Sequence, residues 1–421
     1  MISDSLLEKI GSAVERFCAW LDHHGELSYD HQSFFAGPVG RRAKALYYRK
    51  PLLGTAAVAP MIFLEAFVPS GRKLFWKPQR FPIADAHYAM GFAFLAGSNG
   101  ADGDYRRAVH FLEVLEQTRC KNYEDFAWGY PFDWETRTGT MKASTPLITT
   151  VPYVYEAFSQ VHALDNDPHW LGIMRSIAEH AFHGYRDLEI RSGIASCAYS
   201  PEPDAPYGIV NASAYRAYLL TRAGLELSAP PYLKAAEKNL NFVLASQNQD
   251  GSWHYSMDGE RDFVDHFHTC FVLKALAKIE ELTGCVRCRA AIERGASYYF
   301  KNLFDANGLP LPFSRAPRLT VYRRELYDYA ECINLGVLLR GRFPEFDRTM
   351  DAALADLLER WQQKDGSFRT RELVLGWDNV PMHRWAQSQV FRSLCFLLAR
   401  KSEGRQTAVA HRELPASPVR L

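Results

Sequence analysis

The segment Asp250-Gly251-Ser252-Trp253 recurs in altered form as Asn307-Gly308-Leu309-Pro310 and Asp365-Gly366-Ser367-Phe368, and an earlier version reads Arg191-Ser192-Gly193-Ile194. The four glycines are therefore separated by 58, 57 and 58 residues. An amphipathic stretch precedes each glycine, and a new apolar segment opens 15–20 residues after it. A fixed period of this size is typical of a repeated supersecondary unit that cannot bury its apolar face alone. The unit is predicted to be helix, turn, helix.

The same helical pattern extends along the whole chain, interrupted by turn signals such as Ser98-Asn99-Gly100. Helices are expected over Ser5–His24, Arg42–Ala66, Ile83–Ala96, Asp104–Arg119, Pro146–Leu164, Trp170–Tyr185, Asn211–Leu225, Tyr232–Gln247, Asp265–Thr283, Arg287–Phe304, Leu326–Arg340, Arg348–Gln363 and Arg384–Arg400. These predict an all-α fold, a closed α/α toroid of about six helical hairpins with minor short strands in its loops. An open α-solenoid is the alternative. Closure is favoured because the long loops follow the outer helices and so gather on one face. We expect a single toroid domain over residues 1–401 and a flexible tail over 402–421.

Composition narrows the classes of function. Lys and Arg number 49 against 48 Asp and Glu, so there is no basic excess with which to bind nucleic acid. Aromatic residues make up 13% of the chain and include platforms suited to sugar rings. The N-terminus shows no secretory signal, and the eight cysteines are scattered as reduced thiols are, which predicts a cytoplasmic protein. The lone Cys285-Val286-Arg287-Cys288 pair lacks further ligands, so no metal and no cofactor are expected.

One segment is apolar almost throughout. Leu52 to Pro69 follows a group of basic residues, and its length approaches that of a transmembrane helix. Pro60 and Glu65 interrupt it, however, and an inner helix surrounded by other helices is also apolar on all sides. We therefore expect a buried inner helix here and no membrane span.

Several inner helices begin with more polar residues than a helix cap requires. On a helix, residues three and four positions apart share a face, so Asp265 with His268, Asp328 with Glu331 and Arg384 with Gln387 are expected to project together. In a closed ring these helix ends converge on one mouth. The residues concerned are Tyr153, Asn211, Tyr215, Asp265, His266, His268, Asp328, Tyr329, Glu331, His383, Arg384, Trp385 and Gln387. Asn211 and Asp265 are equally ordinary N-cap residues.

Two long loops combine aromatic and charged residues. The segment 128–137 contains Trp128, Tyr130, Asp133, Trp134 and Arg137 within ten residues, and the segment 371–383 contains Trp377. Long loops within a compact domain are usually functional. The mixture suits a sugar, because rings stack on its faces and carboxylates accept hydrogen bonds from its hydroxyl groups. The alternative for segment 128–137 is a packed lid over the end of the toroid.

The catalytic candidates follow from proton chemistry. Two carboxylates on one helical turn repel, which raises the pKa of one and separates an acid from a base, so Asp328 and Glu331 are the first candidates. His266, His383 and Tyr329 are candidates for proton transfer. Arg384 or Arg137 is expected to pair with a substrate carboxylate through a bidentate fork. The chain lacks the Walker, GxGxxG, HExxH and GxSxG motifs.

The segments Gln247-Asn248-Gln249-Asp250-Gly251-Ser252-Trp253 and Gln362-Gln363-Lys364-Asp365-Gly366-Ser367-Phe368 resemble the QW-type repeats of the α/α-toroid superfamily. That superfamily includes terpenoid cyclases, protein prenyltransferases and six-hairpin carbohydrate-active enzymes, and the resemblance covers about residues 190–400. The acidic DxDD and DDxxD motifs of the cyclases do not occur. Trp128-Gly129-Tyr130-Pro131-Phe132-Asp133-Trp134, together with segments 145–150 and 211–217, is more similar to bacterial polysaccharide-biosynthesis proteins. The glucuronyl C5-epimerases have a comparable barrel.

The expected function is an enzyme of exopolysaccharide or surface-glycan biosynthesis that acts on an acidic carbohydrate by epimerisation, elimination or hydrolysis. The expected partner is a glycan or glycolipid substrate, and peripheral membrane association stays open. Two alternatives remain: an isoprenoid-handling, cyclase-like enzyme, and a non-catalytic glycan-binding or scaffold protein.

Overall fold

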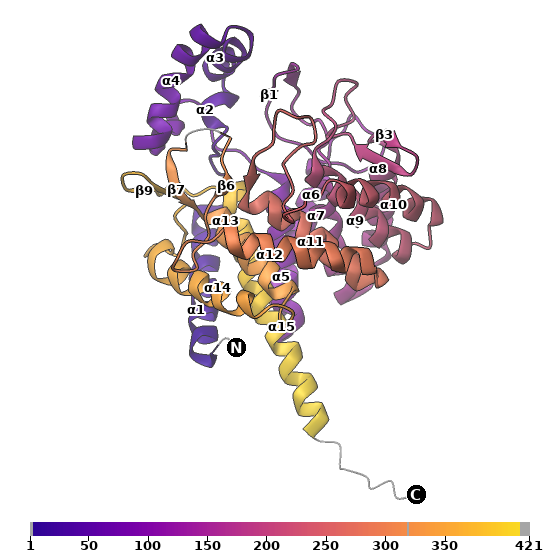
Figure 1. Cartoon of the computed structure of the whole chain (residues 1–421). Helices are drawn as coiled ribbons and strands as arrows, with labels where there is room; N and C mark the ends of the chain where they lie inside the picture. The colour runs from indigo at the N-terminus through magenta and orange to yellow at the C-terminus, as the bar shows by residue number, and fades with distance from the viewer. Residues whose placement is uncertain (1–2, 318–319, 413–421) are drawn as a thin grey trace, which may run out of the picture.

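Six helices of the described chain form a closed inner ring (Figure 1). The computed structural model describes residues 3–317 and 320–412. The inner helices are α5 (Pro82–Asn99), α7 (Val151–Asp165), α9 (Val210–Glu226), α11 (His266–Thr283), α13 (Leu326–Leu338) and α15 (Ser388–Arg412). Each packs against the next, and α15 packs against α5. They are apolar around most of their circumference because helices surround them.

An outer layer completes six helical hairpins. It consists of α1 (Asp4–His24), α6 (Asp102–Thr118), α8 (Pro168–His183), α10 (Pro230–Ala245), α12 (Val286–Asn302) and α14 (Pro344–Asp356), which continues into the π-helical turn η2 (Leu357–Trp361). Each outer helix from α6 to α14 packs on the inner helix before it, and α1 packs on α15. The predicted closed α/α toroid is therefore confirmed, with the first and last helices forming one hairpin. Helix α15 runs to Arg412, and residues 413–421 of the predicted tail lie outside the described residues.

The periodic glycines occupy turns that follow outer helices, as predicted. Gly193, Gly251, Gly308 and Gly366 have φ values of 76°, 93°, 77° and 98°. A Cβ atom on Gly251 would collide with the carbonyl oxygen of Arg294 in α12, and one on Gly366 would collide with that of Arg16 in α1. Glycine is needed at both because of the positive φ and the close approach of the neighbouring helix.

A glutamine before two of these glycines ties adjacent repeats together. Gln247 Nε2 donates to the carbonyl oxygens of Gly251 at 3.0 Å and of Ala291 in α12 at 2.9 Å. Gln362 Nε2 donates in the same way to Gly366 at 3.1 Å and to Ala13 in α1 at 2.8 Å. The hydrogen bond from Gln247 thus joins the end of α10 to α12, and the equivalent bond from Gln362 joins the end of η2 to α1.

Short antiparallel strands lie in the loops that lead from outer to inner helices, on the upper side of the ring in Figure 1. They pair as β1 (Trp134–Glu135) with β2 (Thr140–Met141), β3 (Asp187–Arg191) with β4 (Ile194–Cys197), β5 (Val264–Asp265) with β6 (Phe313–Arg315), and β7 (Tyr322–Glu325) with β8 (Arg371–Leu373) and β9 (Trp377–Asp378). This side of the ring is called the mouth below.

Residues 25–81 form an arm between α1 and α5 that contains α2 (Ser33–Ala36), α3 (Pro38–Arg49), α4 (Pro51–Phe67) and the 3₁₀ helix η1 (Pro69–Leu74). The prediction of a single helix over Arg42–Ala66 is wrong, because the structure has two helices there. The chain reverses at Lys50, where φ is −138°, because the residue before a proline avoids helical geometry. Gly54 then lets α4 approach the backbone of Tyr47.

The expectation that the apolar segment 52–69 is buried is also wrong. Helices α3 and α4 form a hairpin that projects from the ring, and Leu52 is 91% exposed at its tip (Figure 1). A buried inner helix and a membrane span both fit the apolar content of this segment. Composition alone does not determine whether protein, lipid or solvent surrounds a helix. Within the described residues, no helix combines the length and apolar character that crossing a bilayer requires.

Candidate active site

A cleft of about 590 Å³ opens at the mouth of the toroid. Its walls are α3 of the arm, the β1–β2 hairpin, the loop 199–209 before α9, and the loop 255–263 before α11. Trp134, Tyr199, Tyr255 and Phe263 supply its aromatic lining, and His268 reaches it from the first turn of α11. The volume falls within the range of about 300–1,000 Å³ that is typical of small-molecule sites.

One carboxylate both starts helix α11 and holds an imidazole at the cleft. Asp265 is the N-cap residue, and its side chain accepts a hydrogen bond from the backbone N–H of His268 at 3.0 Å. Its other oxygen lies 2.6 Å from His268 Nδ1. Asp265 is buried, whereas the His268 side chain is 23% exposed. Because Nδ1 is engaged by the carboxylate, Nε2 is the ring nitrogen available to the cleft.

Aromatic rings pack beneath and beside this imidazole. The Tyr255 ring lies 4.6 Å from His268, and Phe271 meets it edge-on at 5.5 Å. Nearby, Tyr327 stacks on Trp385 at 4.9 Å, and Phe267 packs edge-on against both. These rings exclude water from one side of His268 and leave the other side open to the cleft.

Asp328 is a buried carboxyl group beneath the mouth. Neither of its oxygens has a hydrogen-bond partner among the described residues. Burial raises its pKa well above the ordinary range, and the negative charges of Glu325 and Asp265 raise it further. The sequence analysis expected the Asp328–Glu331 pair to raise the pKa of one of its acids. Glu331 does raise the pKa of Asp328, but it contributes less than Glu325 and Asp265 do.

Glu331 instead belongs to a line of charges along the axis of the ring. It forms an ion pair with Lys274 of α11 and lies 3.6 Å from Arg392 of α15. Burial lowers the pKa of Lys274 to about 8, even though Glu331 opposes that effect. Farther from the mouth, Glu156 of α7 pairs with Lys278 of α11.

These axial residues, Glu331 apart, were missed by sequence reasoning. Lys274 and Glu156 are each flanked by apolar residues of an inner helix, as in Phe271-Val272-Leu273-Lys274-Ala275-Leu276. A solvent-facing helix would show several polar residues with helical spacing instead. That contrast is the signal that would have identified them.

Tyr153 and Tyr215 lie between the mouth and this axis. Their hydroxyl oxygens are 2.7 Å apart, and Lys274 Nζ donates to Tyr153 at 3.3 Å. Both rings are almost fully buried. Asn211, one turn before Tyr215 on α9, is also buried, and its Oδ1 has no hydrogen-bond partner in the part of the chain that the structure describes. The structure thus brings these predicted residues below the cleft rather than onto its walls.

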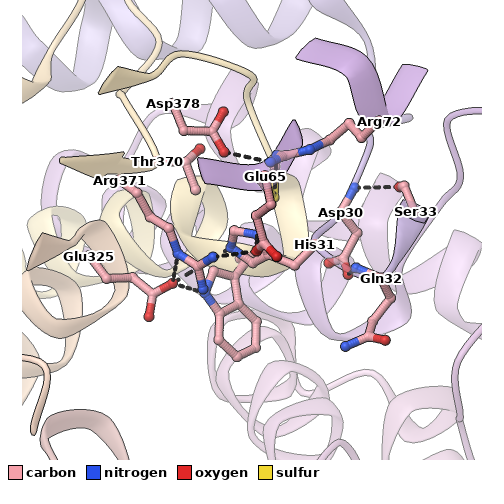
Figure 2. A network of polar contacts seen from close by, with 12 residues as sticks. Asp30, His31, Gln32, Ser33, Glu65, Arg72, Glu325, Thr370, Arg371 and Asp378 are labelled. Carbon is pink, nitrogen blue, oxygen red and sulfur yellow. Dashed lines mark hydrogen bonds and ion pairs between the residues drawn. The ribbon is translucent and has the colours of Figure 1, made fainter. Parts of the chain in front are cut away.

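Buried ion pairs attach the arm to the mouth. Arg384 forms a bidentate pair with Asp30 of the arm, with Nε–Oδ2 and Nη2–Oδ1 distances of 2.8 and 2.6 Å, and its Nη1 donates to Tyr130 Oη at 3.0 Å. Arg72 of η1 donates to Asp378 of β9 at 2.7 Å, as Figure 2 shows. Since Arg384 is fully engaged within the protein, it has no fork left for a substrate carboxylate.

A second group of charges lies beside the first (Figure 2). Arg371 donates from Nη1 to Glu65 of α4 at 2.8 Å and from Nε to Glu325 at 2.5 Å. His31 stands between the two acids, 3.5 Å from Glu65 and 3.6 Å from Glu325. Trp385 Nε1 donates to the same Glu325 oxygen. The arm is therefore fixed against the inner ring by charges that are largely buried, with Glu65 15% and Arg371 9% exposed.

This network predicts a loss of stability in acid. Burial alone would raise the pKa of Glu65, but His31 and the Arg371 guanidinium outweigh it and lower the pKa to about 2. An unfolded glutamate binds its proton near pH 4.5, so Glu65 stabilises the fold above that pH, and this contribution is lost as pH falls from about 4.5 to 2. The shift corresponds to about 3 kcal/mol.

The acid effect is measured by urea unfolding of wild type and Glu65→Gln across this pH range. We expect the variant to show a shallower fall in unfolding free energy with decreasing pH. Some slope remains, because Glu156 also has a pKa of about 2, which its contacts with Lys278 and Arg222 lower against the effect of burial. Parallel pH profiles for the two proteins would contradict the assignment.

Two catalytic candidates point between the inner and outer helices instead of into the mouth. His266 Nε2 lies 2.7 Å from Tyr299 Oη on α12, and Nδ1 lies 3.2 Å from the carbonyl oxygen of Leu311. His383 is bound between Tyr88 Oη at 2.6 Å and the Gly25 carbonyl oxygen at 3.0 Å. Burial lowers the pKa of both histidines to about 3. We therefore withdraw both from the proposed proton-transfer residues.

Tyr329 and two predicted substrate-binding residues also have packing roles. Tyr329 donates to Asp356 of α14. Trp128 has no exposed surface, and its Nε1 donates to the Leu115 carbonyl oxygen at 2.8 Å. Gln387 bonds both backbone groups of Phe368. We withdraw all three from the proposed site, because their polar atoms are satisfied within the fold.

The remaining loop residues divide between the cleft and its surroundings. Trp134 and Arg137 line the cleft. Arg137 Nη1 lies 2.5 Å from Glu260 Oε2, and both side chains of this ion pair are exposed. Asp133 pairs with Arg41 of α3 at 2.8 Å. Trp377 packs edge-on against Trp361 of η2 and is not part of the cleft lining.

Comparison with known proteins agrees with the architecture. No protein-family model and no curated protein matches the chain. Among solved structures, the cellobiose 2-epimerase from Bacillus thermoamylovorans B4167 has a TM-score of 0.61 at 8% identity, covering 76% of this chain and 88% of that one. The GH76 alpha-mannanase of Bacteroides thetaiotaomicron has 0.56 at 9%, covering 77% and 88%. An unsaturated glucuronyl hydrolase specific for heparin has 0.56 at 11%, covering 79% and 88%. At these identities the likeness establishes a shared α/α-toroid fold.

Proposed function

We propose that this protein is a carbohydrate-active enzyme that transfers protons at the mouth cleft through His268. The observation that carries the proposal is the His268–Asp265 pair, which presents an oriented imidazole to a cleft with aromatic walls. The structures that share the fold include an epimerase and hydrolases of carbohydrates, which supports this class of substrate.

The geometry assigns His268 the role of general base. If Asp265 accepts the Nδ1–H bond, the lone pair of the neutral ring is on Nε2, the nitrogen that Asp265 leaves available at the cleft. When Nε2 takes a proton from the substrate, the positive charge that forms on the ring lies 2.6 Å from a carboxylate. We assign Asp328 of α13, whose pKa burial raises well above the ordinary range, as a second candidate for proton transfer.

Proton abstraction from carbon, as in epimerisation or elimination, is favoured over hydrolysis. Hydrolysis of a glycosidic bond ordinarily needs two carboxyl groups that flank the bond. Three of the five carboxylates lining the cleft are already bound: Glu135 to Arg41, Asp258 to Arg261, and Glu260 to Arg137. The other two, Glu202 and Asp204, both lie on the loop 199–209 and so on one wall of the cleft. The oriented group on the wall is a histidine.

The acidic character of the substrate stays a prediction that the cleft charges do not favour. Among the described lining residues, Lys44, Arg137 and Arg261 are basic, whereas Glu135, Glu202, Asp204, Asp258 and Glu260 are acidic. Carboxylates suit sugar hydroxyl groups, which donate hydrogen bonds to them. A neutral glycan therefore fits these walls better than a uronic acid does.

A non-catalytic glycan-binding protein is the second candidate. It is favoured by the extent to which the charges at the mouth are paired with one another, as in Arg384–Asp30 and Arg371–Glu65. The isoprenoid alternative is disfavoured, because a hydrocarbon substrate would meet the charged axis beneath the mouth.

We further propose that the protein acts in the cytoplasm, in surface-glycan or exopolysaccharide biosynthesis. Its substrate would be a free or lipid-linked glycan, and the protein would contact the membrane peripherally.

Solvent exchange tests the function directly. Purified protein is incubated in D₂O with neutral and uronic-acid disaccharides, and ring protons are followed by NMR. We expect loss of one carbon-bound proton: epimerisation replaces it with deuterium, whereas elimination removes it together with the leaving group and leaves a carbon–carbon double bond. Glycan binding without exchange would favour the binding protein, and release of reducing sugar without exchange would favour a hydrolase.

A further inference from the structure

The α3–α4 hairpin carries an exposed apolar surface that the ring does not cover. Leu52, Leu53, Phe63 and Phe67 are 91%, 62%, 59% and 51% exposed, and Leu74 of the following η1 is 87% exposed. Figure 1 shows the hairpin standing away from the toroid on the side of the mouth. Apolar side chains gathered on one projecting element in this way mark an interaction surface.

The charge around this surface has one sign. Residues 34–79 contain eight Lys and Arg but a single acid, Glu65, which is bound to Arg371. Arg42, Arg49, Lys50, Lys73 and Lys77 are exposed. An apolar surface with basic flanks is complementary to a lipid bilayer that carries anionic head groups. A second copy of the hairpin would bring the same cations together and is disfavoured for that reason.

We propose that the α3–α4 hairpin docks on an anionic lipid surface, with Leu52, Leu53, Phe63 and Phe67 entering the bilayer interface and the exposed cations contacting lipid phosphates. This deepens the peripheral association proposed above by naming the element and the lipid chemistry. Helix α3 also supplies Lys44 and Tyr48 to the cleft wall. Docking would therefore place the cleft beside the membrane, within reach of a lipid-linked glycan.

The attachment of the arm supports this arrangement. The pairs Asp30–Arg384, Arg72–Asp378 and Glu65–Arg371 hold the arm to the mouth through buried charges. Because the hairpin is attached in this way, docking on a membrane would fix the orientation of the cleft relative to the bilayer. A flexible tether would hold the protein near the bilayer without orienting it.

Flotation with lipid vesicles tests the proposal without any turnover. Full-length protein is mixed with vesicles of phosphatidylcholine, with and without phosphatidylglycerol, at low and high salt. We expect binding to the anionic vesicles that weakens with salt. Arg49→Gln/Lys50→Gln should weaken partitioning about thirtyfold, since each cation near an anionic surface contributes about fivefold. Leu53→Glu/Phe63→Glu should weaken it by roughly tenfold or more.

The matched control is Leu188→Glu/Ile190→Glu, which places two glutamates at exposed apolar positions of β3, outside the arm. It should float as wild type does. Circular dichroism verifies that each variant is folded. Absence of wild-type protein from anionic vesicles, or equal binding by Leu53→Glu/Phe63→Glu, would overturn the proposal. The proposal would also be overturned if light scattering showed that the wild-type protein is a dimer and that Leu53→Glu/Phe63→Glu is a monomer. Because no substrate is present, the outcome is independent of the D₂O exchange test.

Discussion

Replacing His268 by glutamine should lower kcat/KM by about two to four orders of magnitude, because general-base catalysis contributes that much. Glutamine keeps a donor that can bond Asp265 but has no titratable nitrogen to offer the cleft. The side chain is partly exposed and packs only on its aromatic neighbours, so folding should be little affected. The rate of deuterium exchange into the substrate is the measurement.

Two further variants sharpen this test. His254→Gln makes the same change at a histidine outside the cleft lining and should leave the exchange rate unchanged. Asp265→Asn replaces one carboxylate oxygen by an NH₂ donor and removes the negative charge beside the ring, so it should slow exchange without altering which proton exchanges. If His268→Gln exchanges at the wild-type rate, His268 is not the base and the assignment is wrong.

Replacing Arg384 by methionine should destabilise the fold by about 3–5 kcal/mol, which is the usual effect of breaking a buried ion pair. Asp30 is 1% exposed, and the bidentate contact with Arg384 supplies its cationic partner. Without the guanidinium, a buried carboxylate stays uncompensated or must take a proton. The free energy of unfolding in urea measures the loss, and hydrogen exchange over residues 38–67 should show the arm released.

Arg261→Met is the control for that experiment, since it removes one member of the partly exposed Arg261–Asp258 pair. It should cost about 1 kcal/mol or less. The double variant Arg384→Met/Asp30→Asn should be more stable than Arg384→Met alone, because the stranded charge is gone. Equal losses for Arg384→Met and Arg261→Met would show that the Asp30 pair does not hold the arm.

The toroid was predictable because its signals are local and repeated. Glycine after Asp or Asn, an amphipathic stretch on each side and a period near 58 residues are all visible in the sequence. The ring follows, because such units must bury their apolar faces on one another. The α3–α4 hairpin was misplaced since an apolar helix has the same composition whether protein or another partner covers it.

The site was harder to predict because helical phase decides it. His266 and His268 are two residues apart, so their side chains point about 200° apart on α11. One faces Tyr299 between the helical layers, and the other faces the cleft. The sequence does not say which face is toward the axis, so it named His266 as a catalytic candidate and His268 as a binding residue, and the proposal above exchanges these two roles.

The expected pairing of Arg384 with Gln387 failed for a different reason. The segment η3 (His383–Gln387) is not a regular helix, and Ala386 has φ 119°. The rule that residues three apart share a face therefore does not apply there. Asp328 and Glu331, on the regular helix α13, obey it and both lie toward the interior of the ring.

The seam between α1 and α15 has a consequence for how the chain is made. During synthesis the ribosome releases α1 first and α15 last, so α5 and α13 each lack a neighbour until the final helix emerges. The hydrogen bond from Gln362 to Ala13 joins residues 349 positions apart and can form only after Gln362 has emerged. A nascent chain ending near residue 380 would expose the apolar flanks of two inner helices. We infer that completion of the ring is a late event that follows release of the C-terminal helix.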